Sequence, residues 1–162
     1  MTLEKELHLS KGIKVGAHEA ILNIYYTAAI IKKQADVFFR GFGLTDVQFN
    51  VMMLLRYQSD SKGGLSQARL SRMMLVNRAN VTSIIDRMEK AKMVVRTATS
   101  GDRRCNIIKL TEDGRKLVTK VEPLYIQRVQ QITACLNEGE QKKLISMLGK
   151  IRMKLFAQDS AK

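Results

Sequence analysis

The chain has 162 residues and 45% hydrophobic content, which allows one domain with helical extensions, and its 28 basic and 15 acidic residues give a formal charge of +13. No apolar run approaches the ~20 residues of a membrane span, and the N-terminus lacks the apolar segment of a secretory signal. Cys105 and Cys135 lie far apart without a CxxC pair, which excludes a disulfide framework and predicts a cytoplasmic protein.

The first part of the chain predicts two helices. Apolar side chains recur at helical spacing over about 14–40 without a proline, and Gly41 and Gly43 are placed to end that helix. A second helix starts at Thr45, whose side chain suits an N-cap, and it ends before the polar loop 59–64.

A short helix is predicted after this loop. Ser66 is placed to cap a helix over 67–74, in which Leu70 and either Met73 or Met74 face inward. The brief stretch that follows indicates a tight connection to the next helix.

That next helix, about 78–91 with Asn77 as a candidate N-cap, has two contrasting faces. Helical spacing puts four apolar residues in one buried stripe: Val81, Ile84, Ile85 and Met88. The other side carries Ala79, Asn80, Thr82, Ser83, Asp86, Arg87 and Lys90. A helix that needs only solubility would favour Glu and Lys there, whereas Thr, Ser, Asn and Arg bond to phosphates and base edges.

A β-hairpin follows. Val94–Ala98 and Arg104–Leu110 are rich in strand-forming residues, and the polar turn Thr99–Arg103 between them contains a glycine. Because arginines lie at its tip, this hairpin is typical of a wing that reaches a nucleic-acid backbone or minor groove.

The C-terminal part predicts two further helices. Thr111 is placed to cap the first, which continues to about Leu136, and Pro123 should kink or break it. Asn137 and Glu140 have the spacing of a capping box and open the last helix.

Positive charge is concentrated in the helix pair and hairpin. Residues 62–104 hold ten basic and three acidic side chains, a net +7, while the other 119 residues carry the remaining +6. This clustering is typical of a polyanion-binding module rather than of a uniformly basic surface.

The first helix and the last two are too long and too apolar on one side for the small winged lobe to cover them. A twofold copy of the same chain is the commonest partner for such faces, and a dimer would present two wings to a palindromic duplex. We therefore expect a homodimer rather than a monomer.

Three segments in this order resemble the multiple-antibiotic-resistance regulator (MarR) family of winged helix-turn-helix transcription factors. They are LSQARLSRMM from Leu65, NRANVTSIIDRMEKAKMVVR from Asn77, and DRRCNIIKLTEDG from Asp102. The last contains the family's Asp-x-Arg wing followed by Leu-Thr-x-x-Gly. The resemblance implies one mainly α domain over 1–162 with a small β-wing: a winged lobe at about 44–110 and dimerisation helices at about 11–41 and 111–158.

The resemblance also implies a function. It predicts a homodimeric DNA-binding regulator, most simply a repressor on a palindromic operator, that responds to a small aromatic or anionic apolar effector near the junction of the two lobes. The residues that it implies for DNA contact are Ser66, Gln67, Asn77, Arg78, Asn80, Thr82, Ser83, Arg87, Asp102, Arg103 and Arg104. Asp102 would orient an arginine of the wing.

Other functional classes are less well supported. A redox switch at Cys105 stays open, although a strand cysteine without a nearby resolving partner is more often structural; Cys135 is expected in the core. No catalytic set is present, and His8 and His18 are too few for a metal site, so we expect no enzyme and no cofactor. A nonspecific nucleic-acid binder or a protein-binding winged helix remains possible, but RNA-stacking aromatics are absent between Lys62 and Arg104.

Overall fold

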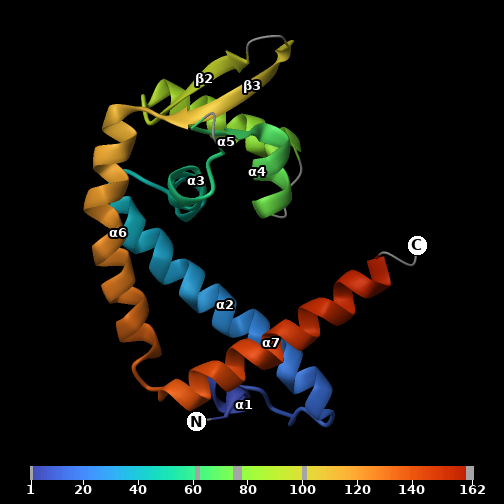
Figure 1. Ribbon diagram of the computed structural model, residues 1–162. Coiled ribbons are helices and arrows are strands. Elements are labelled where there is room, and N and C mark those ends of the chain that lie inside the picture. Colours follow the sequence, from blue (N-terminus) through green and yellow to red (C-terminus); the bar gives the residue numbers. More distant parts are fainter. Residues whose placement is uncertain (1, 61–62, 75–77, 100–101, 160–162) are drawn as a thin grey trace. The chain divides into compact units, whose positions relative to one another are not determined.

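The computed structural model describes residues 2–60, 63–74, 78–99 and 102–159, apart from the side chains of 78, 99, 102–106 and 159. Its elements in chain order are α1 Leu3–Glu6, α2 Gly16–Arg40, α3 Asp46–Tyr57, β1 Leu65–Ser66, α4 Gln67–Met74, α5 Arg78–Lys90, β2 Val94–Thr99, β3 Asp102–Leu110, α6 Glu112–Thr133 and α7 Glu138–Asp159. This order confirms a mainly α fold with a small β-wing (Figure 1).

Two compact units make up the chain, Met1–Val118 and Thr119–Lys162, and α6 runs from the first into the second. The first unit contains the winged lobe, in which α3, α4 and α5 lie together on one side of the β2–β3 hairpin (Figure 1).

Local capping sets where several helices begin. The Thr45 hydroxyl accepts from the Gln48 backbone N–H at 3.2 Å, and the Gln48 side chain accepts from the Thr45 backbone N–H at 2.9 Å. Asn137 and Glu140 make the same reciprocal pair at the start of α7. These expected caps are confirmed.

The sheet has three antiparallel strands in the order β1-β3-β2. The β2–β3 hairpin was expected, but β1 was not: Leu65 pairs with Ile108, and Ser66 with Ile107. The hairpin also extends further than expected, because Thr99 pairs with Asp102 after an irregularity at Ala98. Asp102 and Arg103 therefore belong to β3 and not to the turn.

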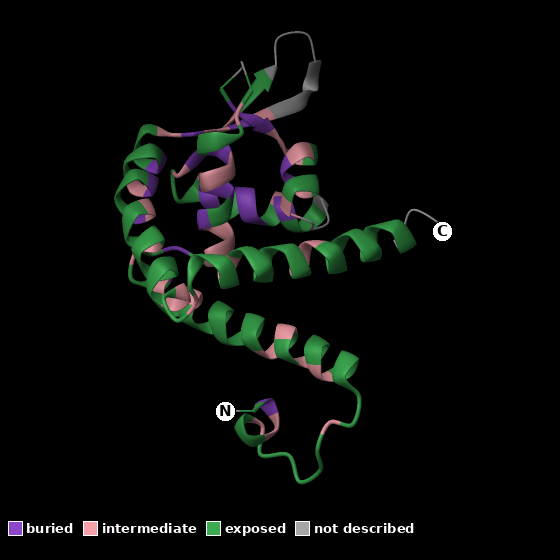
Figure 2. Cartoon of the chain, turned by 60° about the horizontal axis from the view of Figure 1, so that its bottom comes forward, coloured by how far each residue is buried: buried purple, intermediate pink, exposed green. Residues whose placement is uncertain are grey.

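The hydrophobic core lies within the winged lobe, where the buried segments gather in Figure 2. The α5 stripe is buried as expected, and it shares the core with side chains from α3, α4, β3 and α6: Phe49, Met52, Leu70, Ile108 and Val118. Burial of this kind contributes ~25 cal/mol per Å² of apolar surface, so the lobe has its own source of stability.

Three expectations for side chains and helix ends need correction. Cys135 is exposed, because α6 ends at Thr133 and leaves Cys135 in the turn before α7. Of the two methionine alternatives in α4, Met73 is 38% exposed and Met74 is half-buried, so Leu70 is the fully buried residue of this helix. Of the two outcomes expected at Pro123, a kink or a break, the break is wrong, because α6 continues through this residue.

Candidate nucleic-acid interface

The N-termini of α4 and α5 are suited to phosphate. Of the described helices, these two alone have no acidic residue in the first turn. Because the first backbone N–H groups of a helix point outward and its dipole favours anions, an acid-free start leaves that position open to a phosphate. The Ser66 hydroxyl caps α4 by accepting from the Arg69 backbone N–H at 3.2 Å, as expected.

The exposed side of α5 carries most of the residues expected to read DNA. Asn80, Ser83 and Arg87 are exposed, and Thr82 is half-buried. The Arg87 Nε donates to the Ser83 carbonyl oxygen at 3.3 Å, and no carboxylate pairs with this guanidinium among the described residues. Its charge is therefore available to an anion.

Three of these side chains also line a cavity. Asn80, Ser83 and Arg87 border a space of about 450 Å³, so this flank of α5 faces α2 and α3. The full lining is Lys32, Asp36, Thr45, Asp46, Val47, Asn80, Ser83, Ile84 and Arg87. The helical spacing places these residues on the polar side but could not reveal the cavity.

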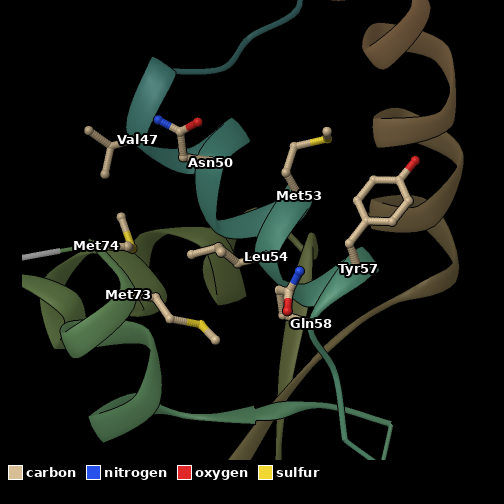
Figure 3. A pocket seen from close by; sticks show the side chains of 8 residues that line it. All are labelled: Val47, Asn50, Met53, Leu54, Tyr57, Gln58, Met73 and Met74. Atoms are coloured by element: carbon tan, nitrogen blue, oxygen red, sulfur yellow. The ribbon is translucent and has the colours of Figure 1, made fainter. Parts of the chain in front are cut away.

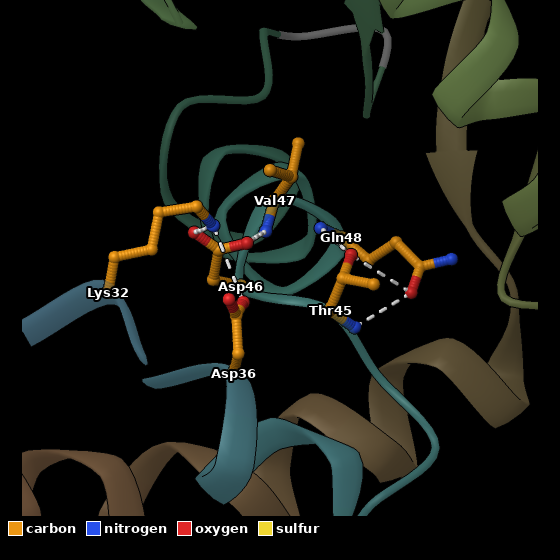
Figure 4. A network of polar contacts seen from close by, with 6 residues as sticks. All are labelled: Lys32, Asp36, Thr45, Asp46, Val47 and Gln48. Carbon is orange, nitrogen blue, oxygen red and sulfur yellow. Dashed lines mark hydrogen bonds and ion pairs between the residues drawn. The ribbon is translucent and has the colours of Figure 1, made fainter. Parts of the chain in front are cut away.

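A polar network on the opposite wall of this cavity joins α2 to the start of α3 (Figure 4). The Lys32 ammonium lies 3.0 Å from a carboxylate oxygen of Asp46 and 3.3 Å from one of Asp36. The hydrogen bond to Asp46 raises the pKa of Lys32, so the ammonium remains charged over the whole neutral range. Asp46 also accepts from the Val47 backbone N–H at 2.8 Å.

The wing is attached to α5 by Arg96, which the sequence reasoning counted only as a charge. Its guanidinium pairs with both Asp86 and Glu89, and Glu89 also accepts from the Arg96 backbone N–H at 3.0 Å. Burial lowers the pKa of Arg96, but the hydrogen bonds and charges of the two carboxylates raise it by more. The spacing could have suggested the contact, since Asp86 and Glu89 are i,i+3 on a helix and a strand returns directly after it.

The turn from α5 into β2 is held by the Leu-Thr-x-x-Gly motif. The Thr111 hydroxyl donates to the Lys92 carbonyl oxygen at 2.6 Å and accepts from the Gly114 backbone N–H at 3.0 Å. A Cβ at Gly114 would lie 2.1 Å from the Met93 carbonyl oxygen, so only glycine fits there. The motif therefore fixes the start of α6 against the turn that follows α5.

Five of the remaining expected contact residues have side chains outside the described part of the chain. Asn77 lies outside the described residues, and so do the side chains of Arg78, Asp102, Arg103 and Arg104. Gln67 is half-buried at the first position of α4.

Within the described part of the chain, no cluster of three His, Cys, Asp or Glu residues could hold a metal, and no helix has the length and hydropathy to span a membrane.

Comparison with known proteins gives a consistent picture. Residues 42–104 match the model of the MarR family. The HTH-type transcriptional regulator YkoM of Bacillus subtilis is 32% identical over 67% of this chain and 68% of its own length. The HTH-type transcriptional repressor NicR of Pseudomonas putida is 32% identical over 67% of this chain and 66% of its own. The S. aureus MepR–DNA complex superposes with a TM-score of 0.75 at 23% identity, covering 81% of this chain and 94% of MepR.

Proposed function

This chain belongs to the MarR family of winged helix-turn-helix transcriptional regulators, and we propose that it is a homodimeric repressor that binds a palindromic operator and releases it when a small molecule binds. Members of this family are regulators rather than enzymes. The structure of a related fold, MepR, contains DNA, and the relative NicR is named a repressor; both support the proposal.

One observation carries the DNA-binding part. The helix α5 presents Asn80 and Ser83 close to its acid-free N-terminus and Arg87 in its last turn, and Arg96 holds the wing against the same helix. A recognition helix can enter the major groove while the attached wing reaches the backbone or minor groove. In this proposal the α5 side chains read bases, and Arg103 and Arg104 contact the backbone.

Uncovered apolar side chains support the dimer. In α7, Ile145 is 66% exposed, Met153 74% and Phe156 52%. In α2, Tyr25 is 69% exposed and Val37 65%. Soluble monomers rarely leave so many large apolar side chains uncovered, so we place the dimer contacts in residues 11–41 and 111–158.

The dimer can be tested by light scattering on the purified protein. We expect a mass of twice 18.4 kDa for the wild type. Phe156→Glu, which puts a charge on the α7 face, should shift the equilibrium toward the monomer, whereas Lys154→Glu changes charge without removing an apolar side chain. A wild-type monomer at micromolar concentration would contradict the proposal.

The cavity between α2, α3 and α5 supports effector control. Its volume of about 450 Å³ suits a small molecule, and Lys32 and Arg87 on its walls suit an anionic group. Asn80 and Ser83 belong both to this cavity and to the proposed base-reading set, so a ligand here would compete with the arrangement that binds DNA. A differential affinity of ~1.4 kcal/mol between the two conformations would change DNA affinity about tenfold.

Selection from genomic duplex fragments tests the operator. We expect an enriched inverted repeat with half-sites about one helical turn apart, ~34–36 Å. Arg104→Ala should weaken binding to every duplex and lower the salt slope by about one unit, since it removes one backbone contact. Asn80→Ala and Ser83→Ala should change the preference among operator variants. Selection without an enriched palindrome, or identical effects of both variant types, would refute this division of roles.

Linkage tests the effector. Phenolic acids and hydrophobic drugs would be titrated against the protein–operator complex, and ligand binding would then be measured with and without DNA. An effector that releases DNA must bind more weakly to the complex by the same factor. If no compound shifts either equilibrium while an oxidant acts through Cys105, redox control replaces the small-molecule proposal.

A further inference from the structure

A second cavity, of about 570 Å³, lies inside the winged lobe between α3 and α4 (Figure 3). Its lining comprises Val47, Asn50, Met53, Leu54, Tyr57 and Gln58 from α3 and its C-cap, and Met73 and Met74 from α4. Met73 and Met74 extend from α4 on the side of α3, and Leu54 points toward them (Figure 3). The volume falls within the ~300–1,000 Å³ of small-molecule sites.

The lining chemistry selects against charged ligands. The eight lining residues include no Asp, Glu, His, Lys or Arg. Because moving an ion out of water costs several kcal/mol without a compensating charge, an ionised molecule would bind poorly here. In this respect the cavity differs from the one at α2, which contains Lys32, Asp36, Asp46 and Arg87.

The same lining favours an aromatic ring with one polar group. Met53, Met73 and Met74 supply three flexible, polarisable thioethers, and sulfur–aromatic contacts contribute ~0.3–1.5 kcal/mol each. The side-chain amides of Asn50 and Gln58 have no hydrogen-bond partner among the described residues and can reach a hydroxyl or carbonyl at the rim. Met73 is 38% exposed, so a ligand would cover apolar surface that the chain leaves uncovered.

We infer that the α3–α4 cavity binds an uncharged, planar aromatic molecule with one hydroxyl or carbonyl group. Such a ligand would lie between α4 and the core helix α3. The helix α4 is followed by α5 in the chain. A ligand that displaced α4 would therefore change the positions of the α4 and α5 N-termini relative to the DNA phosphates. This regulatory consequence, a weaker operator complex, rests on the function proposed above, whereas the binding itself does not.

The binding can be followed with 2-naphthol, which is uncharged at neutral pH, and with protein labelled at its methionine methyl groups. The chain has nine methionines and no tryptophan, so the NMR spectrum is simple and naphthol fluorescence is unobstructed. We expect the resonances of Met53, Met73 and Met74 to shift during the titration while that of the α7 residue Met153 stays in place.

Two pairs of variants test the location. Met73→Glu places a carboxylate in the cavity and should weaken 2-naphthol binding about tenfold or more, whereas Met73→Leu keeps an apolar side chain and should bind within about threefold of the wild type. Gln58→Glu and Gln58→Asn repeat the comparison at an exposed position where misfolding is not expected. Thermal melts followed by circular dichroism check that each variant is folded.

The outcomes separate this inference from the proposed function. No shift at the solubility limit of 2-naphthol, shifts confined to other methionines, or unchanged binding by Met73→Glu would each overturn the site. Failure to select any operator would refute the proposed function and leave the methionine shifts to decide the cavity. If an operator is bound and 2-naphthol binds the cavity without changing operator affinity, the coupling is overturned.

Discussion

Replacing Arg96 tests whether its ion pairs hold the β2–β3 hairpin against α5. Its guanidinium is the shared counter-charge of Asp86 and Glu89, which lie one turn apart on α5. Arg96→Met keeps an unbranched apolar stem and removes the charge, so the two carboxylates are left facing each other across one helix turn.

The expected size follows from exposure. The side chain of Arg96 is 21% exposed, that of Glu89 36% and that of Asp86 50%. Exposed ion pairs contribute ~0.2–1 kcal/mol, and partial cover moves a pair toward the upper end of this range. Glu89 is also held by the Arg96 backbone N–H. We therefore expect coupling free energies of about 1 kcal/mol for Arg96–Glu89 and about 0.5 kcal/mol for Arg96–Asp86.

Two double-mutant cycles measure these couplings. They combine Arg96→Met with Glu89→Gln and with Asp86→Asn, and urea unfolding gives the free energy of each variant. All variants are compared at one protein concentration, because the stability of a dimer depends on it. Added salt should reduce the coupling to Asp86 more than the coupling to Glu89, since Asp86 is more exposed.

Two results would refute this account of the wing. One is a coupling below about 0.2 kcal/mol for both pairs, which would mean that the contacts do not stabilise the hairpin. The other is a stronger coupling to Asp86 than to Glu89, which would show that exposure and the backbone contact do not decide the order.

Three further predictions concern packing, capping and pH. Gly114→Ala should lower the free energy of unfolding by about 3 kcal/mol, because the new methyl meets the Met93 carbonyl at 2.1 Å; an unchanged urea midpoint would contradict this packing. Thr45→Ala should cost about 1 kcal/mol in the same assay, while Thr45→Ser retains the cap and most of the stability. The pKa of Lys32 is raised by its hydrogen bond to Asp46, so its stabilising contribution is present below the ordinary lysine pKa and is lost as the pH rises through the folded value. The stability difference between wild type and Lys32→Met, under about 1 kcal/mol at pH ~8, should therefore shrink as the pH rises above the ordinary lysine pKa of ~10.4.

The features that sequence predicted well are those fixed by nearby residues. At Thr45, Ser66 and Asn137 the capping side chain accepts from the backbone N–H three positions further on, so each cap is a local feature that the chain itself indicates. The buried stripe of α5 follows from helical periodicity in the same way.

The features that sequence missed depend on distant partners. The strand β1 is only Leu65–Ser66 and is defined by pairing with Ile107 and Ile108, so no local pattern of alternation indicates it. Periodicity separates the buried side of α5 from its polar side, but it cannot tell which polar flank faces α2 and α3. For that reason Arg87 was expected as a DNA contact and not as part of a cavity wall. Cys135 was misplaced because the end of α6 has no glycine or other clear stop signal at Thr133.

The short pairing of β1 with β3 also has a consequence for how such a chain can diversify. Leu65 and Ile108 are paired in the sheet, so the segment between them begins and ends at neighbouring points of the winged lobe. Everything between them, from α4 through the tip of the hairpin, is a cassette with adjoining ends. A segment with other base preferences could be exchanged between those two positions if it kept the buried stripe of α5, which shares the core with α3 and α6.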